Sequence, residues 1–105
     1  VIFAGTNIYP VEIEAALLAM PGVEDCAVFG IPDDEYGERL AAHIMPQRGV
    51  TLTAAAVRAF LSERLASYKI PHLIQFDRDL PREDSGKIMK RKLREPYWAT
   101  AKRQI

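Results

Sequence analysis

Apolar residues recur at helical spacing near the start of the chain. Ile13, Leu17 and Met20 stand at i, i+4 and i+7, so they share one face of a helix. Pro10 suits the first helical position, where the missing amide hydrogen costs nothing. The Pro-Gly pair at residues 21–22 ends the pattern. The sequence therefore predicts an amphipathic helix that begins at Pro10 and ends before this pair.

Three short apolar runs further along the chain predict strands. Residues 23–31 and 39–45 are apolar at their centres, and an acidic turn at residues 32–37 separates them. Residues 73–76, Leu-Ile-Gln-Phe, form the third run. Short apolar runs bounded by glycine, proline and charged residues are typical of buried strands.

A second amphipathic helix is expected between the second and third strands. Thr51 or Thr53 supplies an N-cap hydroxyl. The residue before Pro71 resists helical backbone angles, so the helix ends before that point. Its apolar face consists of Val57, Phe60, Leu61 and Leu65. The order helix, strand, strand, helix, strand predicts an α+β domain, with a small mixed three-stranded sheet packed with helices in two layers.

The composition fits one globular domain of modest size. The chain has 105 residues, of which 49% are hydrophobic and 27% charged. That is enough for one core, but not for a buried two-substrate active site as well. The 14 basic and 14 acidic side chains balance, which argues against a general nucleic-acid or anionic-membrane binder. The apolar stretch at residues 15–20 is far below the roughly 18 residues that span a bilayer, so no membrane span is expected.

The start of the chain and its single cysteine indicate the kind of polypeptide and the cellular compartment to which it belongs. The chain begins at Val1 without a charged-then-apolar leader, and we expect it to be a piece of a longer polypeptide. Cys26 excludes an intrachain disulfide and lies inside an apolar run. We expect Cys26 to be a small buried hydrophobe in a protein of a reducing compartment.

No metal site is expected from the residue pattern. His43 and His72 have no second histidine or cysteine at ligand spacing, which favours hydrogen-bonded surface or core histidines. The acidic residues 33–35, with Glu38, lack the glycine and the spacing of a calcium loop. A solvated acidic turn is therefore expected there.

The C-terminal quarter of the chain is basic and contains a candidate for chemistry. Residues 78–105 hold 9 basic and 4 acidic side chains, whereas residues 1–77 hold 5 and 10. Ser85 and Gly86 make a tight turn that presents Lys87, a point charge suited to reaching an anionic centre. Three interpretations stay open: a solvated basic face, a lysine that contacts phosphate, or a free-standing basic module that binds phosphates of nucleic acid or membrane.

Two segments, taken together, resemble the signature stretches of one enzyme superfamily. Residues 5–14 read Gly-Thr-Asn-Ile-Tyr-Pro-Val-Glu-Ile-Glu, and residues 81–88 read Pro-Arg-Glu-Asp-Ser-Gly-Lys-Ile. Both resemble the C-terminal domain of adenylate-forming enzymes, and within that superfamily the acyl-CoA synthetases most. Four shorter motifs recur between them in the family's order, at residues 21–24, 30–33, 36–38 and 68–71.

The resemblance covers residues 1–95, which are expected to form a C-terminal lid domain. Residues 96–105 are left as a C-terminal tail. The aromatic pair Tyr97-Trp98 lies in this tail. The sequence leaves open whether the pair docks on the domain, docks on an N-terminal partner or lies exposed.

The resemblance implies a role as the lid of a two-domain ligase. Such an enzyme uses ATP to activate a carboxylic acid, expected to be a fatty acid, as acyl-AMP, and transfers the acyl group to coenzyme A. The N-terminal AMP-binding domain of the same polypeptide holds ATP, Mg²⁺ and the acid, and the lid rotates between the two half-reactions. The isolated lid is therefore expected to be inactive, and the whole enzyme to be cytoplasmic.

The resemblance also implies roles for individual residues. Lys87 matches the family's catalytic adenylation lysine, and Gly86 and Ser85 support its loop. The matching lysine of bacterial relatives is reversibly acetylated, which implies a lysine acetyltransferase and deacetylase as partners. The sequence departs from the family pattern at Ala4, where glycine is usual, and at Glu83, where threonine is common. The residues that match the lining of the coenzyme A tunnel are Gly5, Thr6, Asn7 and Tyr9.

Overall fold

A computed structural model of the chain describes residues 2–3 and 6–103, with side chains for residues 7–100. Strands β3 (Val23–Asp33), β4 (Gly37–Pro46) and β5 (Leu73–Phe76) form a mixed sheet in that order. Strands β3 and β4 are antiparallel and β4 and β5 parallel, while β1 (Ile2–Phe3) and β2 (Thr6–Asn7) pair separately. The α+β class and the mixed three-stranded sheet predicted from the sequence are confirmed. The elements in chain order are β1 (Ile2–Phe3), β2 (Thr6–Asn7), α1 (Pro10–Leu18), β3 (Val23–Asp33), β4 (Gly37–Pro46), α2 (Ala54–Ser62), the 3₁₀ helix η1 (Ser67–Lys69), β5 (Leu73–Phe76) and α3 (Lys90–Arg103).

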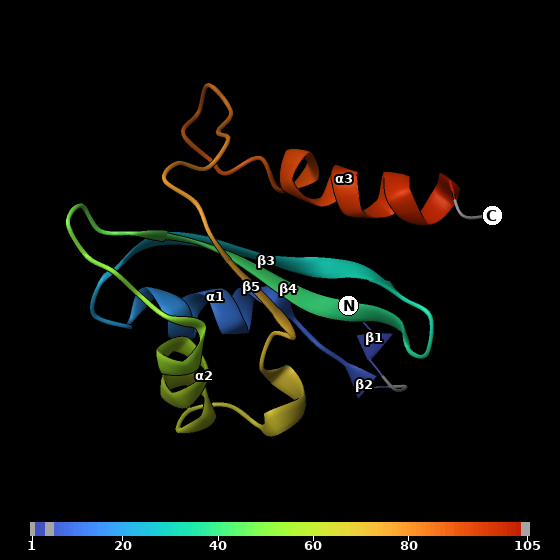
Figure 1. Ribbon diagram of the computed structural model, residues 1–105, viewed down its shortest axis with the longest axis horizontal. Helices are drawn as coiled ribbons and strands as arrows, with labels where there is room; N and C mark the ends of the chain where they lie inside the picture. The colour runs from blue at the N-terminus through green and yellow to red at the C-terminus, as the bar shows by residue number, and fades with distance from the viewer. Residues whose placement is uncertain (1, 4–5, 104–105) are drawn as a thin grey trace.

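The three-stranded sheet is buried on both faces. Successive side chains of a strand point to opposite faces, because a strand has a period of two. In β3, Cys26 and Val28 accordingly belong to one core cluster, whereas Ala27 and Phe29 belong to another. Figure 1 shows α1 and α2 on one side of the sheet and α3 on the other. The sheet thus separates two cores.

Helices α1 and α2 cover one face with most of the residues that the periodicity predicts, but Met20 and Leu65 lie beyond the ends of the two helices. Thr53, one of the two predicted caps, accepts a hydrogen bond from the Ala56 amide at 3.1 Å. Helix α1 ends at Leu18, and the chain then turns through Gly22, whose φ is +95°. This backbone angle favours glycine, and a Cβ there would also make a tight contact, 3.0 Å from Val50 Cγ1. The buried side chains of the two helices are Ile13, Leu17, Val57 and Leu61.

Helix α3 covers the other face and corrects the predicted number of layers. Leu93 and Tyr97 of this helix pack against the core cluster that contains Phe29. The sheet lies between two helical layers, so the domain has three layers where the sequence predicted two. The helix also runs unbroken across the expected boundary between the domain and the tail, which lies between residues 95 and 96. The sequence pattern does not predict this helix, because the segment is polar and contains Pro96, a residue that disfavours the interior of a helix.

A buried hydrogen-bond chain fastens α3 to the sheet. His43 of β4 is 7% exposed, and its Nδ1 lies 2.7 Å from Asp77 Oδ2 and its Nε2 2.8 Å from the Tyr97 hydroxyl. Because a carboxylate only accepts, the Nδ1–H of the ring donates to Asp77, while Nε2 shares a hydrogen bond with the Tyr97 hydroxyl. Burial, and then the charge of Asp77, raise the pKa of Tyr97. His43 is therefore a hydrogen-bonded core histidine. Trp98 Nε1 donates to the Gly30 carbonyl at 3.0 Å, so both residues of the aromatic pair dock on the domain.

The hydrogen-bond chain predicts that Tyr97 stabilises the fold. Tyr97→Phe leaves His43 Nε2 buried without its partner, so the free energy of unfolding should fall by about 1–2 kcal/mol. Urea unfolding of the chain measures this change. Tyr68→Phe, at an exposed tyrosine of η1, is the matched control and should change the free energy by less than about 0.5 kcal/mol. Equal losses in the two variants would contradict a stabilising role for the buried chain.

Candidate functional site

The segment that carries Lys87 forms a tight hairpin. Arg82 and Ile88 pair as an antiparallel bridge at its base. The Glu83 amide donates to the Lys87 carbonyl, and the Gly86 amide donates to the Glu83 carbonyl, each at 2.8 Å. Gly86 has a φ of +91°, which glycine adopts without strain. The predicted turn is therefore present, and its exposed tip consists of Ser85, Gly86 and Lys87.

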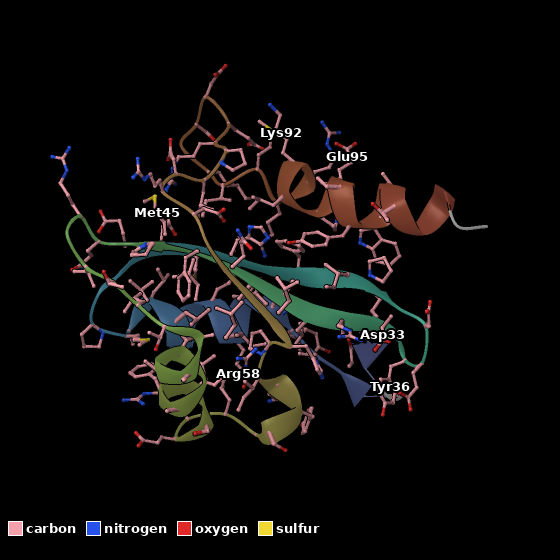
Figure 2. All side chains as sticks on the ribbon, in the orientation of Figure 1. Asp33, Tyr36, Met45, Arg58, Lys92 and Glu95 are labelled. Carbon is pink, nitrogen blue, oxygen red and sulfur yellow. The ribbon has the colours of Figure 1, made fainter. Side chains whose placement is uncertain are left out.

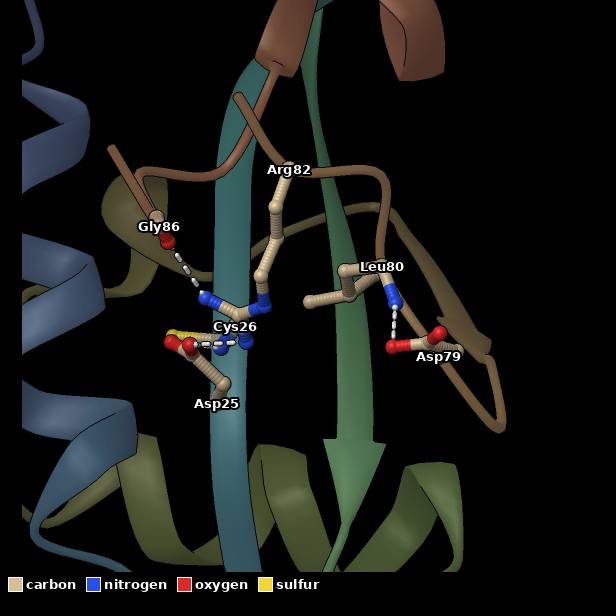
Figure 3. A network of polar contacts seen from close by, with 6 residues as sticks. All are labelled: Asp25, Cys26, Asp79, Leu80, Arg82 and Gly86. Carbon is tan, nitrogen blue, oxygen red and sulfur yellow. Dashed lines mark hydrogen bonds and ion pairs between the residues drawn. The ribbon is translucent and has the colours of Figure 1, made fainter. Parts of the chain in front are cut away.

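Arg82 ties this hairpin to the sheet, as Figure 3 shows. Its Nη2 donates to Asp25 Oδ2 at 2.6 Å, and its Nη1 donates to the Gly86 carbonyl oxygen at 3.0 Å. The other oxygen of Asp25, Oδ1, accepts from the Cys26 amide of β3 at 2.8 Å. Hydrogen bonds between charged groups are shorter and stronger than those between neutral ones. The tip of the hairpin is therefore fastened to β3.

A second ion pair holds the end of the segment where α3 begins. Lys90 Nζ lies 2.8 Å from Glu14 Oε2 of α1, and the same carboxylate oxygen accepts from the Val28 amide at 2.9 Å. Lys87 differs from both Arg82 and Lys90, because it makes no ion pair with the described residues. An open hollow is lined by all three cations. Two of them are neutralised by partners, and Lys87 is not.

The residues expected to line the coenzyme A tunnel lie apart from the hairpin. Gly5, like Ala4, falls outside the described residues, and Thr6 is described by its backbone in β2 alone. Asn7 and Tyr9 are both exposed, and Asn7 Nδ2 donates to the Tyr9 hydroxyl at 3.1 Å. Figure 1 shows β2 and the hairpin at separate ends of the molecule. The structure thus does not bring this group together with Lys87.

Cys26 borders the same hollow, but its thiol is buried and unreactive. The side chain is 4% exposed, and its Sγ donates to the Glu14 carbonyl oxygen at 3.7 Å. Burial, followed by the charges of Glu14 and Asp25, raises the pKa of the thiol from 9.0 to about 12. Because the thiolate is the nucleophilic form, this thiol is inert at neutral pH. The predicted role as a small buried hydrophobe is confirmed.

The buried thiol predicts a loss of stability in alkaline solution. In the folded chain Cys26 keeps its proton until about pH 12, whereas in the unfolded chain it ionises near pH 9. Between these values the folded state binds more protons, so this group lowers the free energy of unfolding by about 1.4 kcal/mol per pH unit. Urea unfolding between pH 8 and pH 11 measures the slope, and Cys26→Ala should remove this share of it. A slope that Cys26→Ala leaves unchanged would show that the thiol is not buried.

The described residues offer no donor set for a metal ion. Within residues 2–3 and 6–103, no group of three or more histidine, cysteine, aspartate or glutamate side chains comes together. At the acidic turn, Asp33 instead accepts from the Arg39 guanidinium at 3.4 Å and from the Glu35 amide at 3.2 Å. Across the same part of the chain, every helix is too short or too polar to cross a membrane.

Several groups at the site do not follow from the sequence pattern. Asp25 and Arg82 are 57 positions apart, and no local spacing links them. Glu14 falls in the first signature stretch, yet the pattern does not reveal that it pairs with Lys90. Related sequences in which such pairs of positions change together would be the signal that finds them.

The pattern that defines one protein family matches most of this chain. It is the AMP-binding enzyme C-terminal domain family, and the match covers residues 12–87, which include the hairpin up to Lys87. The chain belongs to this family.

Three curated relatives are ligases that the chain matches over a short part of their length. One is 3-[(3aS,4S,7aS)-7a-methyl-1,5-dioxo-octahydro-1H-inden-4-yl]propanoyl:CoA ligase of Rhodococcus jostii, 47% identical over 94 residues, which are 90% of this chain and 18% of the relative. Long-chain-fatty-acid–CoA ligase FadD13 of Mycobacterium tuberculosis is 39% identical over 100 residues, 95% of this chain and 20% of the relative. Fatty acid–[acyl-carrier-protein] ligase ScoC of Streptomyces coeruleorubidus is 37% identical over 105 residues, 100% of this chain and 20% of the relative. The chain spans about a fifth of the length of these relatives.

Solved structures share the same fold. ATP-bound MatB from Rhodopseudomonas palustris matches with a TM-score of 0.87 at 42% identity, over 92% of this chain and 19% of that one. A fatty acyl CoA synthetase of Mycobacterium tuberculosis matches with a TM-score of 0.86 at 39% identity, over 95% of this chain and 20% of that one. The fold is that of the C-terminal domain of adenylate-forming enzymes.

Proposed function

We propose that this chain is the C-terminal lid of an acyl-CoA synthetase, an ATP-dependent acid–thiol ligase. The parent enzyme forms acyl-AMP from a carboxylic acid, with fatty acids as the favoured class, and passes the acyl group to coenzyme A in the cytoplasm. One observation carries the proposal: Lys87 is an exposed cation, unpaired with the described residues, on a hairpin fastened to the sheet. Membership of the AMP-binding family and the CoA-ligase relatives support it.

Lys87 has the properties that adenylate formation requires. A carboxylate oxygen attacks the α-phosphorus of ATP, a new P–O bond forms, and the bond to the bridging oxygen breaks so that pyrophosphate leaves. Two anions meet in this step, and negative charge builds on the phosphoryl oxygens. An ammonium placed between them reduces their repulsion and stabilises that charge where water is excluded. Arg82 and Lys90 are already paired with Asp25 and Glu14, whereas Lys87 is available.

We assign ATP, Mg²⁺ and the acid to the N-terminal AMP-binding domain of the same polypeptide. Within the described residues, no group of three or more histidine, cysteine, aspartate or glutamate side chains comes together, and the hollow beside Lys87 is open. Asn7 and Tyr9, with Gly5 and Thr6 beside them in the chain, are our candidates for the pantetheine contact in the second half-reaction. The exposure of Asn7 and Tyr9 at the end of the molecule away from the hairpin supports a lid that presents two different surfaces.

The alternative of a free-standing basic module receives no support from the comparisons. The relatives are ligases, and the family is defined by AMP-binding enzymes. Ion pairs also remove Arg82 and Lys90 from the charge that such a module would present to phosphates.

Replacing Lys87 tests the proposal directly. In the parent enzyme, Lys87→Ala should lower the rate of acyl-adenylate formation by about 100- to 1,000-fold, because a transition-state contact of this kind contributes that much. Thioester formation from supplied acyl-adenylate should be nearly unchanged. Exchange of pyrophosphate into ATP measures the first step, and consumption of the coenzyme A thiol measures the second.

Two further variants sharpen this test. Lys92→Ala, at an exposed lysine on the outward side of α3 (Figure 2), is the matched control and should leave both half-reactions unchanged. Acetyl-lysine at position 87 removes the same charge and should reproduce the loss in adenylate formation, which is how we propose that an acetyltransferase and a deacetylase control the enzyme. Equal loss of both half-reactions in Lys87→Ala would mean that the lysine is structural.

A further inference from the structure

The peptide unit that carries Lys87 is itself held by a side chain. This unit joins the carbonyl of Gly86 to the amide of Lys87, and Arg82 Nη1 donates to its oxygen at 3.0 Å. A peptide unit is planar, so fixing its oxygen also fixes the direction from Gly86 to the Lys87 Cα. The constraint matters here because Gly86, at a φ of +91°, has many other backbone conformations open to it.

Asp25 gives this arginine a fixed anchor on the sheet. Its Oδ2 lies 2.6 Å from Arg82 Nη2, and its Oδ1 accepts from the Cys26 amide at 2.8 Å, so both carboxylate oxygens are used. The register of the β3–β4 pairing shifts between Val23 and Asp25. Irregularities of this kind redirect a side chain out of the regular ladder. The two side chains are 35% and 27% exposed, so solvent reaches the pair only in part.

A guanidinium suits this bridge better than an ammonium. Its nitrogens lie in one plane and point in fixed directions, so Arg82 bonds to the Asp25 carboxylate and the Gly86 carbonyl together. A lysine ammonium is a single point charge on a flexible stem. The bridge therefore depends on the arginine side chain and not on its charge alone.

We propose that Arg82 is a positioning residue for adenylate formation, acting through the Gly86–Lys87 peptide unit with Asp25 as its anchor. This inference rests on the proposed function of Lys87. Arg82 does not touch the reacting atoms. It limits the places that the Lys87 ammonium reaches when the lid meets the nucleotide, and a misplacement of about 1 Å in such a group is enough to cost about 100-fold in rate.

The test uses substitutions at both ends of the bridge in the parent enzyme. Arg82→Gln should lower kcat for acyl-adenylate formation by about 10- to 100-fold, with KM for ATP and acid within about twofold and the thioester step unchanged. Asp25→Asn keeps an oxygen for the Cys26 amide and should lower the same kcat in the same way. The double variant should be no slower than Arg82→Gln alone, because both changes break one bridge. Arg82→Lys should restore little of the rate.

A structural measurement accompanies the kinetics. Hydrogen–deuterium exchange in the peptide spanning residues 83–89 should become faster in Arg82→Gln and in Asp25→Asn. The matched control is Arg39→Gln, which breaks an arginine–aspartate pair with Asp33 at the other end of β3. That variant should change neither the exchange of this peptide nor the rate of adenylate formation.

The outcomes separate this inference from the function on which it rests. If Lys87→Ala leaves adenylate formation unchanged, the proposed function is wrong. If Lys87→Ala abolishes that step while Asp25→Asn leaves it at the normal rate, the function stands and the positioning role of Arg82 is wrong. Full activity in Arg82→Lys, or equal loss of both half-reactions in Arg82→Gln, would also overturn the positioning role.

Discussion

Burial of β3 on both faces is the constraint on which the rest of this domain depends. Residues 26–31 of the strand are all buried, and a strand of that kind needs cover on both sides of the sheet. Helices α1 and α2 supply one cover and α3 supplies the other. The chain must therefore pass from β5, at one edge of the sheet, to α3, which packs on β3 at the opposite edge. The segment that makes this passage is the hairpin with Lys87.

The charges along this passage divide into two kinds. Arg82 and Lys90 are paired with Asp25 and Glu14, so they fasten the two ends of the segment to β3 and α1. Lys87, between them, is exposed and unpaired with the described residues. We propose that Lys87 meets an anion that arrives from outside the domain, which is why the proposed function places the reaction in the neighbouring domain.

Local chemistry accounts for the parts of the fold that the sequence predicts. The strand at residues 73–76, the Thr53 cap and the glycine turn before Lys87 each depend on a few neighbouring residues. The helix across Pro96 and the Asp25–Arg82 pair depend on packing between distant segments, and local spacing carries no trace of them. The tip of the candidate site was therefore predictable, whereas the contacts that hold it in place required the structure.

The most direct test of the central claim is a chemical label that reports which amine meets the nucleotide. An adenosine nucleotide with an aldehyde on its phosphate chain forms an imine with a lysine within reach, and borohydride reduces the imine to a stable amine. In the parent enzyme, we expect mass spectrometry to find this label on Lys87, and excess ATP to prevent it. A label on Lys90 or Lys92 in place of Lys87, or a label on Lys87 that ATP does not displace, would contradict the claim.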